Sequence, residues 1–215
     1  LTYGIPGFKL EKSVVARRVD RLIEGGVEFR LNTDIGKDIA FDDLRASHDA
    51  VLVATGVYQA RRLSAPGCGS NGVVAALDYL IASNRKGFGD AVAAYDDGPL
   101  NAEGKRVVVI GGGDTAMDCV RTAVRQGAVS VTCVYRRDRD NMPGSARETT
   151  NAEEEGVRFE WLAAPKAVLG GSDGVTGLRA ARMALSAPTL DGRWTVEEVP
   201  GGEFDLPADL IIEAL

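Results

Sequence analysis

The stretch from Lys105 to Cys119 reads KRVVVIGGGDTAMDC, and its order of residue types predicts a strand, a tight turn and a helix. The β-branched run favours a strand, and the residues after the three glycines suit an amphipathic helix. Gly111 permits the tight turn, Gly113 lets the backbone approach a pyrophosphate, and Ala116 keeps the helix close to the sheet. The pattern G-x-G-x-x-A is a variant of the Rossmann fingerprint, so it predicts a dinucleotide-binding turn.

The surrounding sequence completes a βαβ unit of about thirty residues. The helix predicted from about Asp114 to Gln126 stops at Gly127, because glycine is a favourable C-terminal cap. A second β-rich run, VSVTCVY, follows at 129–135. The N-terminus of the helix offers free N–H groups and a partial positive charge to a phosphate. The alternative is an ordinary strand–turn–helix connection without a ligand.

The end of the second predicted strand indicates which dinucleotide binds. An acidic residue at this point holds the ribose 2′-hydroxyl of NAD, whereas an arginine accommodates the 2′-phosphate of NADP. Here the strand runs into Arg136, Arg137, Asp138 and Arg139. A guanidinium matches a phosphate in charge and geometry, so these residues favour NADPH over NADH. The alternative is a solvated charge cluster that Asp138 and Asp140 partly neutralise.

The composition is that of a globular protein, with 45% hydrophobic and 26% charged residues. A chain of 215 residues can form one large domain or two small ones. The net charge of −6 argues against a broad nucleic-acid-binding face, and no apolar run is long enough to span a bilayer. Cys68, Cys119 and Cys133 are too far apart for a disulfide framework or a metal-ligand cluster. We expect no metal ligand, no nucleic acid or membrane partner, and a cytoplasmic location.

The N-terminal part of the chain has the pattern of an incomplete α/β domain. Ser13 caps a predicted helix that reaches to about Glu24, the run 27–31 alternates as a strand does, and the run 50–54 resembles a buried strand. No strand and glycine loop precede these segments, and the chain starts at Leu1 without a methionine. We therefore expect a fragment of a longer protein. Three segments then lead to the βαβ unit: a linker at 66–70, a helix at about 75–82 and a long surface loop at 84–104.

The C-terminal part contains several short β-like runs. Residues 151–156 are expected to end a second helix, and four runs follow at 157–162, 166–169, 178–185 and 194–199. Glycine-containing turns separate some of these runs, as in an antiparallel meander. The expected fold class is therefore α/β, with a Rossmann-like parallel sheet and an antiparallel β-meander packed beside it.

Several motifs together resemble a known family. They are Gly4-Ile5-Pro6 with Lys9-Leu10, Ala54-Thr55-Gly56, Gly111–Cys119, and Tyr135-Arg136-Arg137-Asp138 with Asn141-Met142-Pro143-Gly144. Along essentially the whole chain, the sequence resembles the small (β) subunit of NADPH-dependent glutamate synthase and related flavoproteins of the glutathione-reductase type. The resemblance implies that residues 1–63 are part of a FAD-binding Rossmann domain, that 64–205 form the NADPH-binding domain, and that 206–215 start the return to the FAD domain.

The resemblance also implies a chemistry and a partner. In that family a hydride passes from NADPH to FAD, and electrons continue through iron–sulfur clusters to a large (α) subunit that forms glutamate. By matching motif, Arg136 and Arg137 would bind the 2′-phosphate, and Gly56 would lie near the flavin or the domain crossover. The turn and helix start would line the pyrophosphate and the adjoining ribose: Gly111, Gly112, Gly113, Asp114, Thr115 and Ala116. We name no catalytic side chain, because the cofactors carry the chemistry.

The chain also departs from the family pattern. The FAD fingerprint and the cysteine clusters that hold the iron–sulfur centres are absent from the sequence, so we expect this chain alone to be inactive in the overall reaction. Two other functions stay open at this point. One is an NADPH-dependent flavoprotein reductase for another acceptor, and the other is a non-catalytic dinucleotide-binding module.

Overall fold

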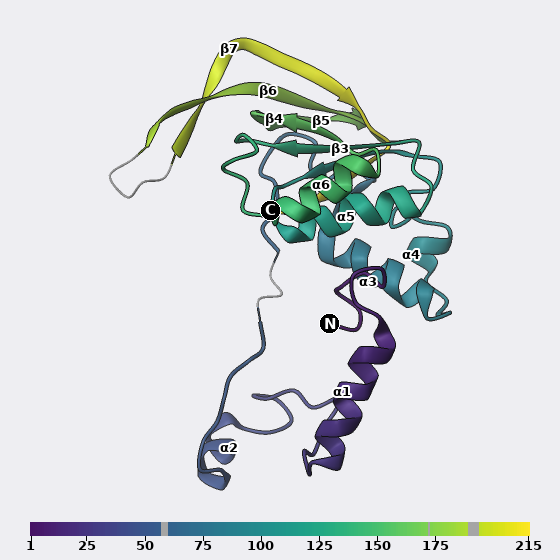
Figure 1. Cartoon of the computed structure of the whole chain (residues 1–215), viewed down its shortest axis with the longest axis vertical. Helices are drawn as coiled ribbons and strands as arrows, with labels where there is room; N and C mark the ends of the chain where they lie inside the picture. The colour runs from purple at the N-terminus through teal and green to yellow at the C-terminus, as the bar shows by residue number, and fades with distance from the viewer. Residues whose placement is uncertain (57–59, 172, 189–193) are drawn as a thin grey trace. The chain divides into compact units, whose positions relative to one another are not determined.

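The computed structural model describes residues 1–56, 60–171, 173–188 and 194–215. The chain divides into two compact units (Figure 1). The larger unit comprises Leu1–Leu10 and Ala60–Leu215, and the smaller comprises Glu11–Gln59.

A five-stranded parallel sheet forms the centre of the larger unit, in the order β1-β8-β2-β3-β4. Its strands are β1 (Val73–Ala75), β2 (Arg106–Ile110), β3 (Ser130–Tyr135), β4 (Arg158–Trp161) and β8 (Leu210–Glu213). The inner strands β2 and β8 are almost entirely buried, as their apolar runs predict for a parallel sheet covered on both faces. The predicted βαβ unit is confirmed, with helix α5 (Asp114–Arg125) connecting β2 to β3.

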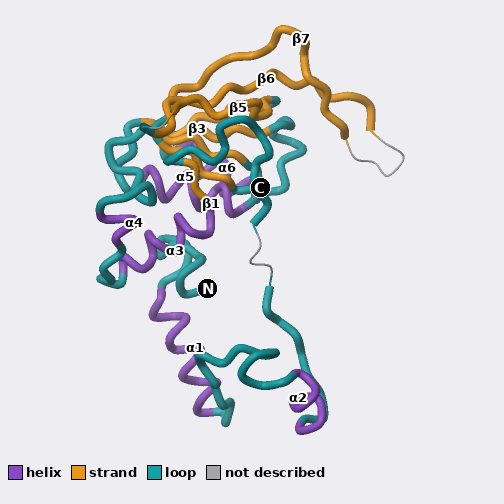
Figure 2. The backbone as a smooth tube through the Cα atoms, turned by 180° about the vertical axis from the view of Figure 1, so that it is seen from behind, coloured by secondary structure: helices purple, strands orange, loops and turns teal. Residues whose placement is uncertain are grey.

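The two faces of this sheet are covered by different layers (Figures 1 and 2). Helices α3 (Ala76–Gly87), α5 and α6 (Ala146–Glu154) cover one face, and the short helix α4 (Ala93–Asp96) follows α3. On this side Val107 and Val109 of β2 pack in one core with Met117 of α5. The intervening residues Val108 and Ile110 point to the other face, where they pack in a second core with residues of the antiparallel sheet.

The second layer is an antiparallel sheet in the order β5-β6-β7, and it confirms the predicted meander. Its strands are β5 (Ala163–Gly171), β6 (Gly174–Pro188) and β7 (Trp194–Pro207). The first of the four predicted β runs, 157–162, is an exception to the prediction. It supplies β4, which pairs in parallel with β3, because α6 provides the crossover that a parallel pair requires.

The apolar run near the C-terminal end of the sequence forms β8, an inner strand of the parallel sheet. β8 pairs with β1 on one side and with β2 on the other, with Ile211 opposite both Val73 and Val108. The family resemblance predicts that 206–215 start the return to the FAD domain. In the structure this segment completes the same sheet that carries the glycine turn, and the division at residues 63 and 205 stays a prediction.

The smaller unit contains helices α1 (Lys12–Glu24) and α2 (Phe41–Ser47). α1 agrees with the predicted helix in extent, but Ser13 lies inside it and Glu11 is the residue at its N-terminal cap. The strands predicted at 27–31 and 50–54 are wrong, since neither run forms a strand. Leu31 is 77% exposed and Leu52 is 89% exposed. A strand needs a neighbour to satisfy its backbone groups, and within described residues 11–56 only an isolated bridge joins Ile35 to Ile39.

The loop predicted over 84–104 is partly helical, since it includes the end of α3 and all of α4. Over the part of the chain that the structure describes, no helix is long and apolar enough to cross a membrane.

An arginine–glutamate cluster joins α5 to the end of α6. Glu155 Oε1 lies 2.8 Å from Arg121 Nη2, and Glu155 Oε2 lies 2.6 Å from Arg125 Nη1. The hydrogen bond from Arg125 holds the pKa of Glu155 at about 2, despite the opposing effect of burial, and Arg121 adds to the shift. A depressed carboxylate pKa stabilises the folded state above its ordinary value of 4.5, and this stabilisation is lost as the pH falls toward 2.

We therefore expect the melting temperature to fall as the pH is lowered from 4.5 to about 2, and Glu155→Gln to make that fall smaller. Asp209 contributes over the same pH range, because the hydrogen bonds of Arg106 hold its pKa at about 2. The melting temperature of the variant should therefore still fall somewhat with pH. Thermal unfolding followed by circular dichroism measures the effect. Glu154→Gln, at an exposed neighbouring position, is the control. If the melting temperature falls equally with pH in the wild type and in Glu155→Gln, Glu155 does not have this stabilising role.

Candidate functional site

The glycine turn lies at the carboxyl edge of the parallel sheet, between β2 and α5. Ile110 is in register with Val134 of β3, and Gly111 N donates a hydrogen bond to Val134 O at 3.1 Å. The arginines that follow β3 therefore emerge at the same edge as the turn. Ligands of open α/β sheets bind in the crevice outside this edge.

The three glycines of the turn differ in what an added side chain would meet. Gly111 has a φ of +148°, and a side chain there would collide with the carbonyl oxygen of Ala214 beyond the end of β8. A side chain at Gly112 would collide with the ring of Tyr135. A Cβ at Gly113, in contrast, would have no described atom within 4 Å beyond its own chain neighbours. Gly111 and Gly112 thus serve the packing of the protein, whereas the space beside Gly113 is open.

The start of α5 presents backbone N–H groups to this open space. Gly113 is the N-terminal cap, and its carbonyl accepts hydrogen bonds from Ala116 N at 2.9 Å and Met117 N at 3.2 Å. The amides of Asp114 and Thr115, before these two, have no acceptor one turn earlier in the helix, and the helix dipole adds a partial positive charge. Ala116 is fully buried, while Asp114 and Thr115 are exposed. These features together suit a phosphate group.

A second loop supports the turn, and sequence reasoning identified it only as part of a family motif. Gly144 N donates to Gly112 O at 2.9 Å, and a Cβ at Gly144 would lie just 2.9 Å from that oxygen. Ser145 N donates to Asp114 Oδ1 at 3.0 Å. In the sequence, the signal for this loop was Gly144 at the end of the motif Asn141-Met142-Pro143-Gly144. Its close approach to Gly112 depends on the fold.

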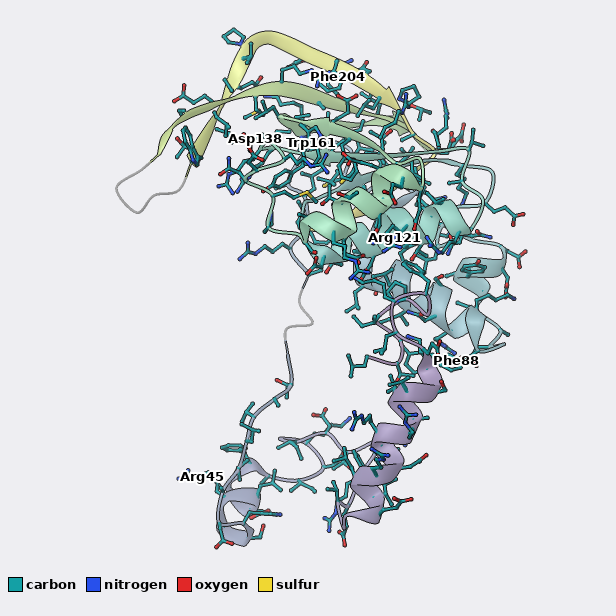
Figure 3. The ribbon with its side chains drawn as sticks, in the orientation of Figure 1. Arg45, Phe88, Arg121, Asp138, Trp161 and Phe204 are labelled. Carbon is teal, nitrogen blue, oxygen red and sulfur yellow. The ribbon has the colours of Figure 1, made fainter. Side chains whose placement is uncertain are left out.

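The acidic residues beside Arg136 and Arg137 do not neutralise them. Asp138 accepts two hydrogen bonds from Asn141, from N at 3.0 Å and from Nδ2 at 2.7 Å, and it lies with Trp161 at one end of the sheet (Figure 3). The third arginine, Arg139, forms an ion pair with a glutamate of α6 at 2.7 Å.

Arg136 is exposed and Arg137 is half-buried. Within the described ranges, neither guanidinium has a carboxylate within ion-pair distance. The Nε atom of Arg137 is buried and has no hydrogen-bond partner there. Two cationic groups thus remain for an anion at the sheet edge, which favours the phosphate-binding interpretation over a neutralised charge cluster.

Gly56 lies in the smaller unit, so the structure does not bring it together with the glycine turn. Its φ of +71° is a left-handed conformation that favours glycine, in agreement with the predicted turn. Its position near a flavin or a domain crossover stays a prediction.

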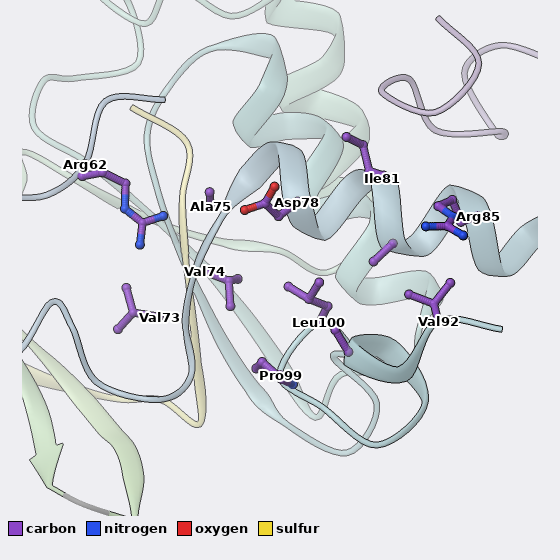
Figure 4. Close-up of a pocket in the computed structure, with 12 residues that line it drawn as sticks. Arg62, Val73, Val74, Ala75, Asp78, Ile81, Arg85, Val92, Pro99 and Leu100 are labelled. Atoms are coloured by element: carbon purple, nitrogen blue, oxygen red, sulfur yellow. The ribbon is translucent and has the colours of Figure 1, made fainter. Parts of the chain in front are cut away.

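A cavity of about 430 Å³ lies elsewhere in the larger unit, beside β1 and α3 (Figure 4). Its lining is largely apolar, and two of its charged groups are arginines with carboxylate partners. Arg62 Nε lies 3.0 Å from Glu213 Oε2, and Arg85 Nε lies 2.9 Å from Asp90 Oδ2. The cavity therefore offers less uncompensated positive charge than the arginine pair at the sheet edge.

Comparison with known proteins adds family evidence. Residues 8–187 match the family model described as pyridine nucleotide-disulphide oxidoreductase. The chain is 62% identical over its full length to a putative glutamate synthase [NADPH] small chain of Cereibacter sphaeroides, of which it covers 51%. It is 59% identical over its full length to the glutamate synthase [NADPH] small chain of Azospirillum brasilense, of which it covers 44%. The chain thus spans about half the length of these relatives, and they confirm the resemblance that the motifs indicated.

A solved structure with a similar fold is FprA from Mycobacterium tuberculosis in complex with NADPH. The TM-score is 0.77 at 18% identity, and the match covers 100% of this chain and 60% of that one. At this identity the similarity concerns the fold alone, and it agrees with the predicted α/β class.

Proposed function

This chain belongs to the pyridine nucleotide-disulphide oxidoreductase family, and we propose that it is the NADPH-binding part of a flavoprotein oxidoreductase. One observation carries the proposal: an open helix N-terminus at Gly113 shares a sheet edge with two arginines that have no carboxylate partner among the described residues. The first feature suits a pyrophosphate and the second suits a 2′-phosphate.

The residues of the site bind and orient the nucleotide. The backbone amides at the start of α5 would hold the pyrophosphate, with Asp114 and Thr115 beside the adjoining ribose, and Arg136 and Arg137 would hold the 2′-phosphate. When bound, NADPH supplies the hydride that reduces a flavin. Gly111 and Gly112 keep the turn close to β8 and Tyr135, which leaves the amides facing the ligand. No side chain of this site is proposed to act as an acid or a base.

The rest of the electron route is proposed for the whole protein. The small-chain relatives are named for NADPH-dependent glutamate synthase, so we propose that FAD accepts the hydride and that electrons pass through iron–sulfur clusters to a glutamate-forming large (α) subunit. Gly56 is proposed to lie near the flavin. Within residues 1–56, 60–171, 173–188 and 194–215, no group of three or more His, Cys, Asp or Glu side chains is placed to hold a metal ion. We therefore assign the clusters to no residue of this chain.

Calorimetric titration of the chain with NADPH and NADH side by side tests the proposal. We expect NADPH to bind at least about tenfold more tightly, a difference of about 1.4 kcal/mol. Equal affinities would leave a dinucleotide site but remove the assignment to NADPH. If neither nucleotide bound to a chain whose circular dichroism indicates a folded protein, the proposal would be wrong.

A further inference from the structure

The N-terminal residues 3–9, which we call the strap, lie against the helices of the larger unit. The ring of Tyr3 meets the ring of Phe88 edge-on, with centroids 5.7 Å apart, and Tyr3 O accepts a hydrogen bond from Asn84 of α3. The ring of Phe8 lies below two guanidinium groups of α5, at 4.8 Å from Arg121 and 3.9 Å from Arg125. The strap is therefore attached to α3 and α5 through aromatic and cation–π contacts.

Lys9, at the end of the strap, bridges two helices. Its Nζ lies 2.7 Å from Asp118 Oδ1 on α5 and 3.5 Å from Glu148 Oε2 on α6. The Asp118 side chain is only 6% exposed. A carboxylate at such a depth is costly without a cation. Lys9 therefore supplies the charge that Asp118 requires, while Arg121 is shared between Glu148 and Glu155.

The pKa shifts agree with this pairing. Burial lowers the pKa of Lys9, but the hydrogen bond to Asp118 and the charges of Asp118 and Glu148 outweigh it, so the pKa lies above its usual value. Burial raises the pKa of Asp118, and Lys9 offsets part of that effect. Loss of Lys9 would leave the Asp118 carboxylate buried beside a second acidic group.

The two bridged helices begin directly after the glycine turn and after Gly144 and Ser145, which support that turn. Asp118 lies one helical turn after Asp114, whose side chain accepts the hydrogen bond of Ser145 N. Glu148 lies in the first turn of α6, which begins directly after Ser145. The starts of α5 and α6 are thus joined twice. The Asp114–Ser145 hydrogen bond joins them at the first residue of α5, and the Lys9 ammonium joins them one helical turn later, at Asp118.

We propose that Lys9 is a positioning residue for the nucleotide site, whose ammonium holds the starts of α5 and α6 together and so maintains the turn that receives the pyrophosphate. This inference rests on the proposed function. Lys9 acts through Asp118 and Glu148, and the strap contacts of Tyr3 and Phe8 keep it in place. Lys9 thereby supports the glycine turn, although it lies more than a hundred positions before Gly111 in the sequence.

The test replaces Lys9 by methionine, which keeps the length of the side chain and removes its charge. We expect NADPH to bind about tenfold more weakly by calorimetry. Amide hydrogen exchange should become faster at residues 112–117 and 144–149 and stay unchanged in the antiparallel sheet. Lys166→Met is the matched control, because it removes an exposed pair with Glu198 at 2.8 Å in that sheet. This control should change neither measurement at the site.

A second variant separates positioning from general stability. Adding Asp118→Asn to Lys9→Met removes the unpaired buried carboxylate, so most of the lost affinity and exchange protection should return. The inference is overturned if Lys9→Met binds NADPH as the wild type does, or if its faster exchange extends evenly over the larger unit. Failure of the proposed function has a different signature, namely absence of NADPH binding to the wild type itself, whatever the exchange pattern of the variant.

Discussion

Replacing Gly113 by valine is expected to weaken both NADPH and NADH by more than about 100-fold, equivalent to about 2.7 kcal/mol, while the chain stays folded. The added side chain would occupy the open space beside the turn, where the pyrophosphate is proposed to bind. The backbone at Gly113 has φ −91° and ψ 176°, an extended conformation that valine accepts. Beyond the adjacent residues of the chain, no described atom lies within 4 Å of the new Cβ, so the cost to folding is about 1 kcal/mol, from the poorer N-terminal cap.

Calorimetry with both nucleotides measures the loss, and circular dichroism verifies that the variant is folded. Gly111→Ala is an informative contrast, since its methyl group would collide with Ala214 and its φ of +148° disfavours any side chain. That variant should lose more thermal stability, whereas Gly113→Val should lose binding with a melting temperature lowered by only about 2–4 °C, the shift that about 1 kcal/mol produces. Unchanged nucleotide affinity in folded Gly113→Val would refute the assignment of the pyrophosphate to this turn.

Replacing Arg136 and Arg137 together by alanine should weaken NADPH by about 100-fold and leave NADH within about threefold of the wild type. Only NADPH carries the 2′-phosphate, and hydrogen bonds between a guanidinium and a phosphate are among the stronger ones in proteins. Neither arginine has a carboxylate partner among the described residues, so little stability should be lost with them. Parallel titrations with the two nucleotides provide the measurement.

Arg139→Ala is the matched control from the same cluster. Its guanidinium is paired with Glu153 at 2.7 Å and also donates to Thr150, so its removal should leave the preference for NADPH nearly intact. Equal losses of NADPH and NADH in the double variant would contradict the role of Arg136 and Arg137 in selecting the cofactor.

The glycine turn was predictable because its signals are local. A β-branched run, three glycines and an amphipathic segment lie within 105–119, and backbone preference and burial periodicity act at that distance. The same holds for α1 and for the long strands of the meander. The runs at 27–31 and 50–54 show the limit of such patterns, because they have no neighbouring strand to pair with among the described residues 11–56 of the smaller unit. The run at 157–162 was assigned to the wrong sheet for a related reason, since strand pairing depends on residues outside the run.

The α/β class, the glycine turn between β2 and α5 and the basic cluster after β3 could be predicted from sequence, because each is encoded in a short run of neighbouring residues. The folded structure was needed to show which charges in that cluster are already paired, why Gly144 must be small, and that Lys9 reaches Asp118 and Glu148. It also decided that β8 completes the sheet beside β2. These are contacts between segments far apart in the chain, and hydrogen bonding and ion pairing depend on distances that only the folded backbone establishes.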